Sequence, residues 1–155
     1  MISFLLFYLL VIPLCVLLHE IGHGLGAVVG SGAHAHVYLG SREGREQVKL
    51  GRMHFHIIWS YSGYCSWDGS LSNRRKLAAL AGGPLMSLLI ASICGWLSVM
   101  TPDGALFSIL RGTAIFSTIQ FFLTACPMTY PGWMKGYGGL PSDGMQMVRL
   151  IKKFQ

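Results

Sequence analysis

Charged residues are scarce in this sequence, and acidic residues are the scarcest. Asp, Glu, Lys and Arg together make up 12% of the 155 residues, with six acidic residues against twelve basic ones. An ordinary soluble domain contains about 25% charged residues. Because 52% of the chain is hydrophobic, this composition excludes a disordered chain and most soluble enzymes. The length is that of a single domain.

A continuous basic surface and a disulfide framework are also lacking. The formal net charge of +6 comes from Lys and Arg in the gaps between long apolar runs, as in membrane proteins, and not from one broad basic face. The four cysteines are too few and too scattered for a disulfide framework. We therefore expect a membrane protein that lies in a lipid bilayer and does not bind nucleic acid.

Three apolar runs are long enough to cross roughly 30 Å of hydrocarbon as helices. We predict a mainly α-helical membrane domain covering residues 1–155, with three transmembrane helices and a short C-terminal helix at about residues 2–30, 73–100, 105–126 and 143–154. Residues 31–72 contain β-prone runs at 37–39, 48–50 and 55–59. We expect these runs to form a small sheet on the cytoplasmic surface.

The positions of Lys and Arg predict the orientation in the membrane. The segment 31–76 contains seven of them and the C-terminal segment from Arg149 onwards contains three, whereas the turn at 101–104 contains none. By the positive-inside rule, the first two segments face the cytoplasm. We expect an integral protein of a prokaryotic plasma membrane with its active site towards the cytoplasmic side.

The densest polar feature lies inside the first apolar run, where His19-Glu20-Ile21-Gly22-His23 forms an H-E-x-x-H pattern. Residues four apart lie on one helical face, so both imidazoles can bind one zinc ion, while the Glu is rotated towards the water that zinc makes acidic. Glu20 is then the general base that accepts the proton. The alternative is a set of polar residues buried at a helix interface, which is disfavoured because such groups are costly inside a membrane.

A catalytic zinc site also needs a third protein ligand. No Glu follows Glu46, and the carboxylates other than Asp143 lie in polar turns or on the opposite side of the membrane. Helix rise places the two histidines roughly 11–17 Å inside the cytoplasmic boundary, Asp143 about 18 Å inside, and an expected helix break at 82–84 about 15 Å inside. Asp143 is therefore the candidate ligand, and the alternative is that it caps the last helix.

These residues together resemble the site-2 protease family of intramembrane zinc metalloproteases. The resemblance covers nearly the whole chain, and its parts occur in the family's order: the H-E-x-x-H helix, a small sheet, Gly83-Pro84, and Asp143-Gly144. It implies one zinc ion per chain, bound by His19, His23 and Asp143, with Glu20 as general base. The substrates that it implies are transmembrane proteins or peptides. Further partners would be a regulatory membrane protein or a second copy of the chain.

The chain departs from the family pattern at two places. Ser87 stands where the family usually has Asn after its Gly-Pro, and Thr124 begins Thr-Ala-Cys-Pro where the family tends to have Asn-Leu-Leu-Pro. Those asparagines are thought to hold the substrate or the developing oxyanion, so Ser87 and Thr124 are candidate substrate-binding or oxyanion residues. The connection at 128–139 is longer than usual, and its Gly and aromatic content suggests a flap or a re-entrant loop. With no PDZ or CBS domain, the chain would be a minimal member.

The sequence therefore favours an intramembrane zinc endopeptidase that hydrolyses peptide bonds in or next to transmembrane segments. The alternative is a catalytically idle membrane protein that binds zinc and acts through partners, and only the missing asparagines support it. Two further His-x-His pairs, His34/His36 and His54/His56, each place their side chains on one face of a strand. They are either surface or interface residues or a second metal site.

Overall fold

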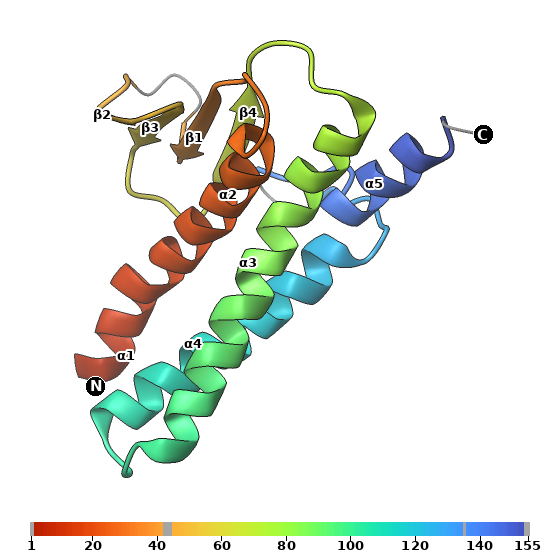
Figure 1. Cartoon of the computed structure of the whole chain (residues 1–155). Coiled ribbons are helices and arrows are strands. Elements are labelled where there is room, and N and C mark those ends of the chain that lie inside the picture. The colour runs from red at the N-terminus through yellow and green to blue at the C-terminus, as the bar shows by residue number, and fades with distance from the viewer. Residues whose placement is uncertain (1, 42–44, 135, 154–155) are drawn as a thin grey trace.

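The computed structural model describes residues 2–41, 45–134 and 136–153. Three long helical segments run side by side, with a sheet at one end and a short helix near it (Figure 1). The helical elements are α1 (Ile2–Leu6), the π-helical η1 (Phe7–Val11), α2 (Ile12–Val28), α3 (Asn73–Met100), α4 (Ala105–Ala125) and α5 (Asp143–Ile151).

The prediction of three long apolar helices and a short C-terminal helix is confirmed. The segments Phe4–Val28, Asn73–Met100 and Ala105–Ala125 are each long and apolar enough to cross a membrane. The predicted first helix ends two residues early, because Gly30 adopts a left-handed conformation with φ of 66°. The predicted end of the last helix, residue 154, lies outside the described residues.

The first helical segment contains a π-helical stretch, and Pro13 explains its position. Proline has no backbone N–H, so the carbonyl of Leu9, four residues earlier, lacks its usual α-helical donor. The indole Nε1 of Trp59 donates to that carbonyl over 2.8 Å. Since Trp59 lies in the connection that follows the third strand, this bond ties the helix to the sheet.

The helix α3 is continuous through Gly82-Gly83-Pro84, so the predicted break there is wrong. Packing against α2 explains why the glycines are needed. A Cβ on Gly22 would overlap the carbonyl oxygen of Gly82, and a Cβ on Gly82 would overlap that of Gly22. The two helices therefore contact each other backbone to backbone, which only residues without a side chain allow.

The sheet has the strand order β2-β3-β1-β4. In it, β1 (Ala35–Leu39) is parallel to β3 (Met53–Ile57) and antiparallel to β4 (Gly63–Trp67), and β2 (Val48–Leu50) is antiparallel to β3. The three predicted β-prone runs all overlap strands. The edge strand β4 was not predicted, because its sequence Gly-Tyr-Cys-Ser-Trp has no β-branched residue.

One face of the sheet packs on α2 and forms the core. Ala35, Val37 and Leu39 alternate along β1 and are fully buried. The core cluster on this side of the sheet contains Ala27, Val28, Ala33, Ala35, Val37, Met53, Cys65, Leu71 and Ala79. The histidines of β1 and β3 therefore lie on the opposite face of the sheet.

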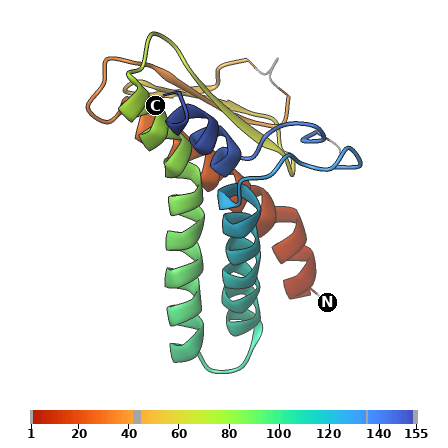
Figure 2. The ribbon, with the colours of Figure 1, turned by 90° about the vertical axis from the view of Figure 1, so that its right-hand side faces the viewer.

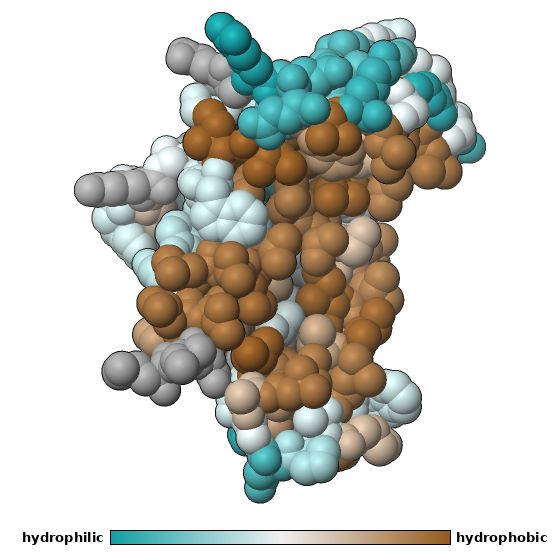
Figure 3. Space-filling view, turned by 90° about the vertical axis from the view of Figure 1, so that its left-hand side faces the viewer, coloured by the Kyte–Doolittle hydropathy of each residue, from teal (hydrophilic) through white to brown (hydrophobic). Residues whose placement is uncertain are grey.

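Apolar side chains cover the middle of the molecule's surface. In Figure 3 a hydrophobic zone occupies the middle of the face shown, and hydrophilic residues gather at both ends. The large exposed hydrophobic residues include Leu89, Ile93 and Trp96 on α3 and Ile115, Ile119 and Phe122 on α4. A monomer in water rarely exposes so continuous an apolar surface.

Candidate metal centre

Three potential metal ligands meet where α2 approaches the start of α5. The Nε2 atoms of His19 and His23 lie 3.2 Å apart. Oδ2 of Asp143 lies 3.5 Å from Nε2 of His19 and 3.3 Å from Nε2 of His23. The structure thus brings together the three residues that the sequence selected as ligands.

The donor set fits zinc. Two zinc–nitrogen bonds of about 2.0–2.1 Å at a tetrahedral angle place their nitrogens about 3.3 Å apart, close to the separation found here. Both imidazoles are buried, with His19 only 3% and His23 only 6% exposed. A Cβ on Gly83 of α3 would overlap Nε2 of both histidines, so the absence of a side chain leaves room beside them for an ion.

Hydrogen bonds from α3 orient both imidazoles. Nδ1 of His23 lies 2.8 Å from the carbonyl oxygen of Ala79, which can only accept, so Nδ1 carries the proton. In the neutral ring of His23 the lone pair is then on Nε2, the atom that would bind an ion. In the protonated ring Nε2 also carries a proton and donates to Asp143. Nδ1 of His19 lies 2.8 Å from the hydroxyl of Ser87, which is fully buried. Such outer partners hold the rings of metal-binding histidines in place.

Asp143 is held by the residues on either side of it. Ser142 caps α5: its hydroxyl accepts from the backbone N–H of Met145 and donates to the carbonyl of Cys126 over 2.6 Å. Asp143 is therefore the first residue of the helix and not its cap. A Cβ on Gly144 would overlap the carbonyl oxygen of Ala125, so glycine after the aspartate lets α5 lie close to the end of α4. Figure 2 shows α5 beside the sheet-side ends of α3 and α4.

The two histidines set the charge state of Asp143. Burial alone would raise the pKa of its carboxyl group. Hydrogen bonds from His19 and His23 outweigh that effect and lower the pKa to about 2. The carboxyl group is therefore ionised at neutral pH, as a metal ligand must be.

Glu20 lies beside this cluster in the wall of a large cavity. The cavity has a volume of about 790 Å³ and is lined by His19, Glu20, His23 and Asp143, by β4, and by residues of α4 and of the connection that follows α4. Glu20 is 7% exposed, and a Cβ on Gly63 would overlap its side chain. The glycine that begins β4 thus lets the edge strand come directly beside the carboxylate.

Ser87 and Thr124, the two candidate substrate-binding residues, occupy different positions. Ser87 interacts with His19 as described, behind the metal ligands. Thr124 lines the cavity, but its hydroxyl donates to the carbonyl of Gln120 in its own helix over 2.9 Å. In this structure neither hydroxyl is directed as a donor into the cavity.

Gln120 and Tyr137 are two of the polar residues that line the cavity, and neither was predicted from the sequence as a site residue. Gln120 lies one turn before Thr124, and its buried Oε1 has no hydrogen-bond partner among the described residues. Its spacing from Thr124, on the same helical face of an apolar run, could have revealed it. Tyr137, in the connection between α4 and α5, is the second. Burial raises the pKa of its hydroxyl to about 12, so the group stays protonated and can donate a hydrogen bond at neutral pH.

Comparisons of this chain with protein-family models, with curated proteins and with solved structures give no match.

Proposed function

We propose that this chain is an intramembrane zinc endopeptidase that hydrolyses peptide bonds in or next to transmembrane segments of other membrane proteins. The observation that carries the proposal is the convergence of His19, His23 and Asp143 on one point, with Glu20 beside them in the wall of a large cavity. One zinc ion per chain would be held there. Two imidazoles and a carboxylate, with a further position left open, are the ligand set of catalytic zinc.

The proposal places the three long helices in a bilayer. Their length and composition, and the hydrophobic zone in Figure 3, support this placement. The basic residues around the sheet favour a cytoplasmic position for that end, in the plasma membrane of a prokaryote. The metal centre lies at the sheet end of α2, so a substrate would be cut near the cytoplasmic side of its span.

In the proposed reaction Glu20 is the general base. When bound, zinc supplies a Lewis acid that polarises the scissile carbonyl and makes water more acidic. Glu20 accepts the proton of the attacking water and then donates it to the leaving amine. Because backbone amides within a helix are hydrogen-bonded and shielded, the substrate must be extended at the cleaved bond. The edge strand β4, which borders the cavity, offers backbone groups to such a segment.

The resemblance to the site-2 protease family supports the same class of reaction. One observation favours the alternative, a zinc-binding membrane protein without catalytic activity. Ser87 and Thr124, which stand at the family's asparagine positions, direct their hydroxyls to His19 and to the α4 backbone and not to a substrate. An active enzyme would need another hydrogen-bond donor for the oxyanion. Gln120 lies one helical turn before Thr124 and also lines the cavity, and its side-chain amide can donate.

Replacement of Glu20 tests the proposal. The purified Glu20→Gln variant should keep one zinc ion, because its three ligands remain, and should lose at least about 100-fold in cleavage rate with the general base. Cleavage is measured on a panel of tagged single-span membrane proteins, and zinc by elemental analysis. The matched control is Asp103→Asn, which removes an exposed carboxylate at the opposite end of the helices. Full activity of Glu20→Gln would reject the mechanism, and zinc without cleavage in the wild type would favour the idle alternative.

A further inference from the structure

The outer face of the sheet carries four histidines that the proposed reaction does not use. His36 on β1 and His54 on β3 are register partners in the parallel pair, and His34 and His56 lie two residues away on the same face. The rings of His36 and His54 stack with their centroids 4.6 Å apart. The four imidazoles thus form one continuous cluster, on the side of the sheet away from α2.

Within this cluster the close contacts run between strands. Nδ1 of His34 lies 3.1 Å from Nε2 of His54, and Nδ1 of His36 lies 3.2 Å from Nε2 of His56. These separations match the 3.2 Å between the Nε2 atoms of His19 and His23. They are also close to the roughly 3.3 Å expected for two imidazole nitrogens on one tetrahedral zinc ion.

A carboxylate fixes the tautomer of one histidine in each pair. Oε2 of Glu46 contacts Nδ1 of His54, and Oδ2 of Asp68 lies 3.1 Å from Nε2 of His36. Because an ionised carboxylate only accepts hydrogen bonds, those ring nitrogens carry the protons. The bond from His54 lowers the pKa of Glu46 and so keeps it ionised.

The opposite nitrogens of the same two rings therefore carry lone pairs. Nε2 of His54 directs its lone pair at His34, and Nδ1 of His36 directs its lone pair at His56. In metal sites, a carboxylate often accepts a hydrogen bond from the ring nitrogen that does not bind the metal. This bond orients the imidazole and makes the other nitrogen more basic.

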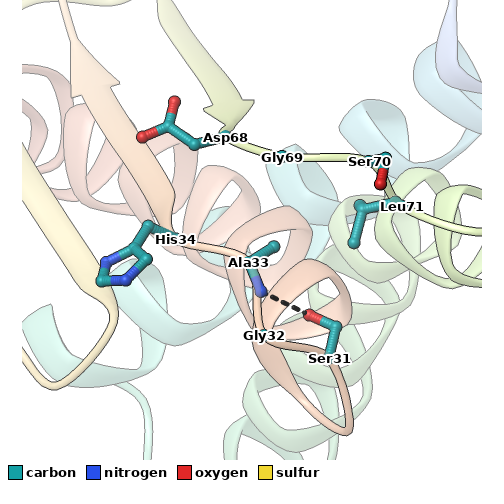
Figure 4. A pocket seen from close by; sticks show the side chains of 8 residues that line it. All are labelled: Ser31, Gly32, Ala33, His34, Asp68, Gly69, Ser70 and Leu71. Carbon is teal, nitrogen blue, oxygen red and sulfur yellow. Dashed lines mark hydrogen bonds between the residues drawn. The ribbon is translucent and has the colours of Figure 1, made fainter.

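The cluster borders the solvent at His34, His36 and Asp68, whereas His54 and His56 are buried. His34 and Asp68 border a surface cavity of about 330 Å³, shown in Figure 4 between the start of β1 and the end of β4. The backbone N–H of Asp68 donates to the carbonyl of His34 over 2.9 Å, which holds the two residues together. The Asp68 side chain is 71% exposed. Lys49, the register partner of His54 on β2, adds a positive charge on this face, which Glu46 and Asp68 offset.

We propose that this outer face is a second metal-binding site, in which the pair His34/His54 and the pair His36/His56 each bind a divalent transition-metal ion such as zinc or copper. Imidazole nitrogen suits these ions. With two protein ligands each, and water in the remaining positions, both ions would exchange readily, unlike an ion at the buried centre of His19, His23 and Asp143. The site does not depend on the proposed protease activity.

Zinc binding by the purified full-length protein in detergent tests the proposal. The wild type should bind three zinc ions per chain in excess zinc and keep one after dialysis against a weak chelator. His34→Gln and His36→Gln should each remove one exchangeable ion and the double variant both, while the retained ion stays. Neither residue is fully buried, so the fold should persist, and circular dichroism verifies it. Tyr38→Phe, on the same face and stacked on His56, is the control that should change nothing.

Copper gives an independent measurement of the ligands. Pulsed electron paramagnetic resonance of Cu²⁺ added to the wild type should show echo modulation from the remote imidazole nitrogens. In the double variant, the Cu²⁺ that occupies the exchangeable sites should no longer show this modulation. Asp143→Asn should lose the retained zinc and keep the exchangeable ions, so failure at one site is distinguishable from failure at the other. The proposal is overturned if the wild type never exceeds one zinc per chain, or if the double variant binds as many ions as the wild type.

Discussion

The hydroxyl of Tyr137 bonds both backbone groups of Gly63. The N–H of Gly63 donates to it over 2.9 Å, and the hydroxyl donates to the carbonyl of Gly63 over 3.4 Å. Gly63 begins the edge strand β4 and packs against Glu20. The connection between α4 and α5, for which the sequence predicts a flap or a re-entrant loop, therefore occupies the backbone groups that an added substrate strand would need at this position.

Tyr137→Phe should free those groups. A hydrogen bond contributes about 1 kcal/mol, so the amide of Gly63 should exchange its hydrogen about fivefold faster, as measured by hydrogen–deuterium exchange. Tyr130→Phe is the matched control, since Tyr130 donates to the carbonyl of Leu123 and not to Gly63. If the protein is the proposed protease, KM for a substrate should fall in Tyr137→Phe while kcat changes little. Unchanged exchange at Gly63 would show that the tyrosine does not hold the connection in place.

Asp143→Asn should lower the affinity of the buried centre for zinc. Loss of an outer hydrogen-bond partner of a ligand already costs 10–100-fold in affinity, so removing a ligand's charge should cost at least about tenfold. Ser142 caps α5, so the fold should survive the change, which circular dichroism checks. Zinc content after dialysis against a weak chelator is the measurement, with Asp103→Asn as control. Retention of zinc by Asp143→Asn would remove Asp143 from the ligand set.

Gly83→Ala and Gly22→Ala should separate metal binding from folding. A Cβ at position 83 would overlap the imidazole nitrogens of His19 and His23, so zinc should be lost. Thermal stability should fall less than in Gly22→Ala, because side chains and not backbone must shift. A Cβ at position 22 would overlap the backbone of Gly82, which cannot move without parting α2 from α3, so stability should fall markedly. Gly95→Ala meets only an ordinary contact and should leave zinc bound. Normal zinc content in Gly83→Ala would contradict the proposed position of the ion.

The proposed orientation can be tested by labelling single cysteines. In a background without the four native cysteines, Ser70→Cys lies at the sheet end and Asp103→Cys in the turn between α3 and α4, and both positions are exposed. An impermeant maleimide on intact cells should label position 103 and not position 70, because the basic residues near the sheet favour the cytoplasm. Both should react in permeabilised cells. The reverse labelling would place the metal centre near the outer face.

Local patterns in the sequence determined the helices and half of the candidate site. Apolar runs of about 20 residues favour helices, so the long helices were predicted to within a few residues. Four-residue spacing alone placed His19 and His23 on one helical face. The continuity of α3 through Pro84 was not predictable in this way. The close contact of Gly82 with Gly22 was equally unpredictable, because it is a property of two segments and not of one.

Tertiary structure decided the partners of those residues. Asp143 is 120 positions after His23. Its prediction as a ligand needed an assumed depth in the membrane and a family resemblance. Only the packing of α5 shows that its side chain reaches the histidines. The role of Ser87 behind His19, the edge strand β4 and the cross-strand pairing of His34 with His54 had no local pattern that could reveal them. The physical reason is that periodicity depends on residues within a few positions of each other, whereas these contacts depend on the register between elements distant in the chain.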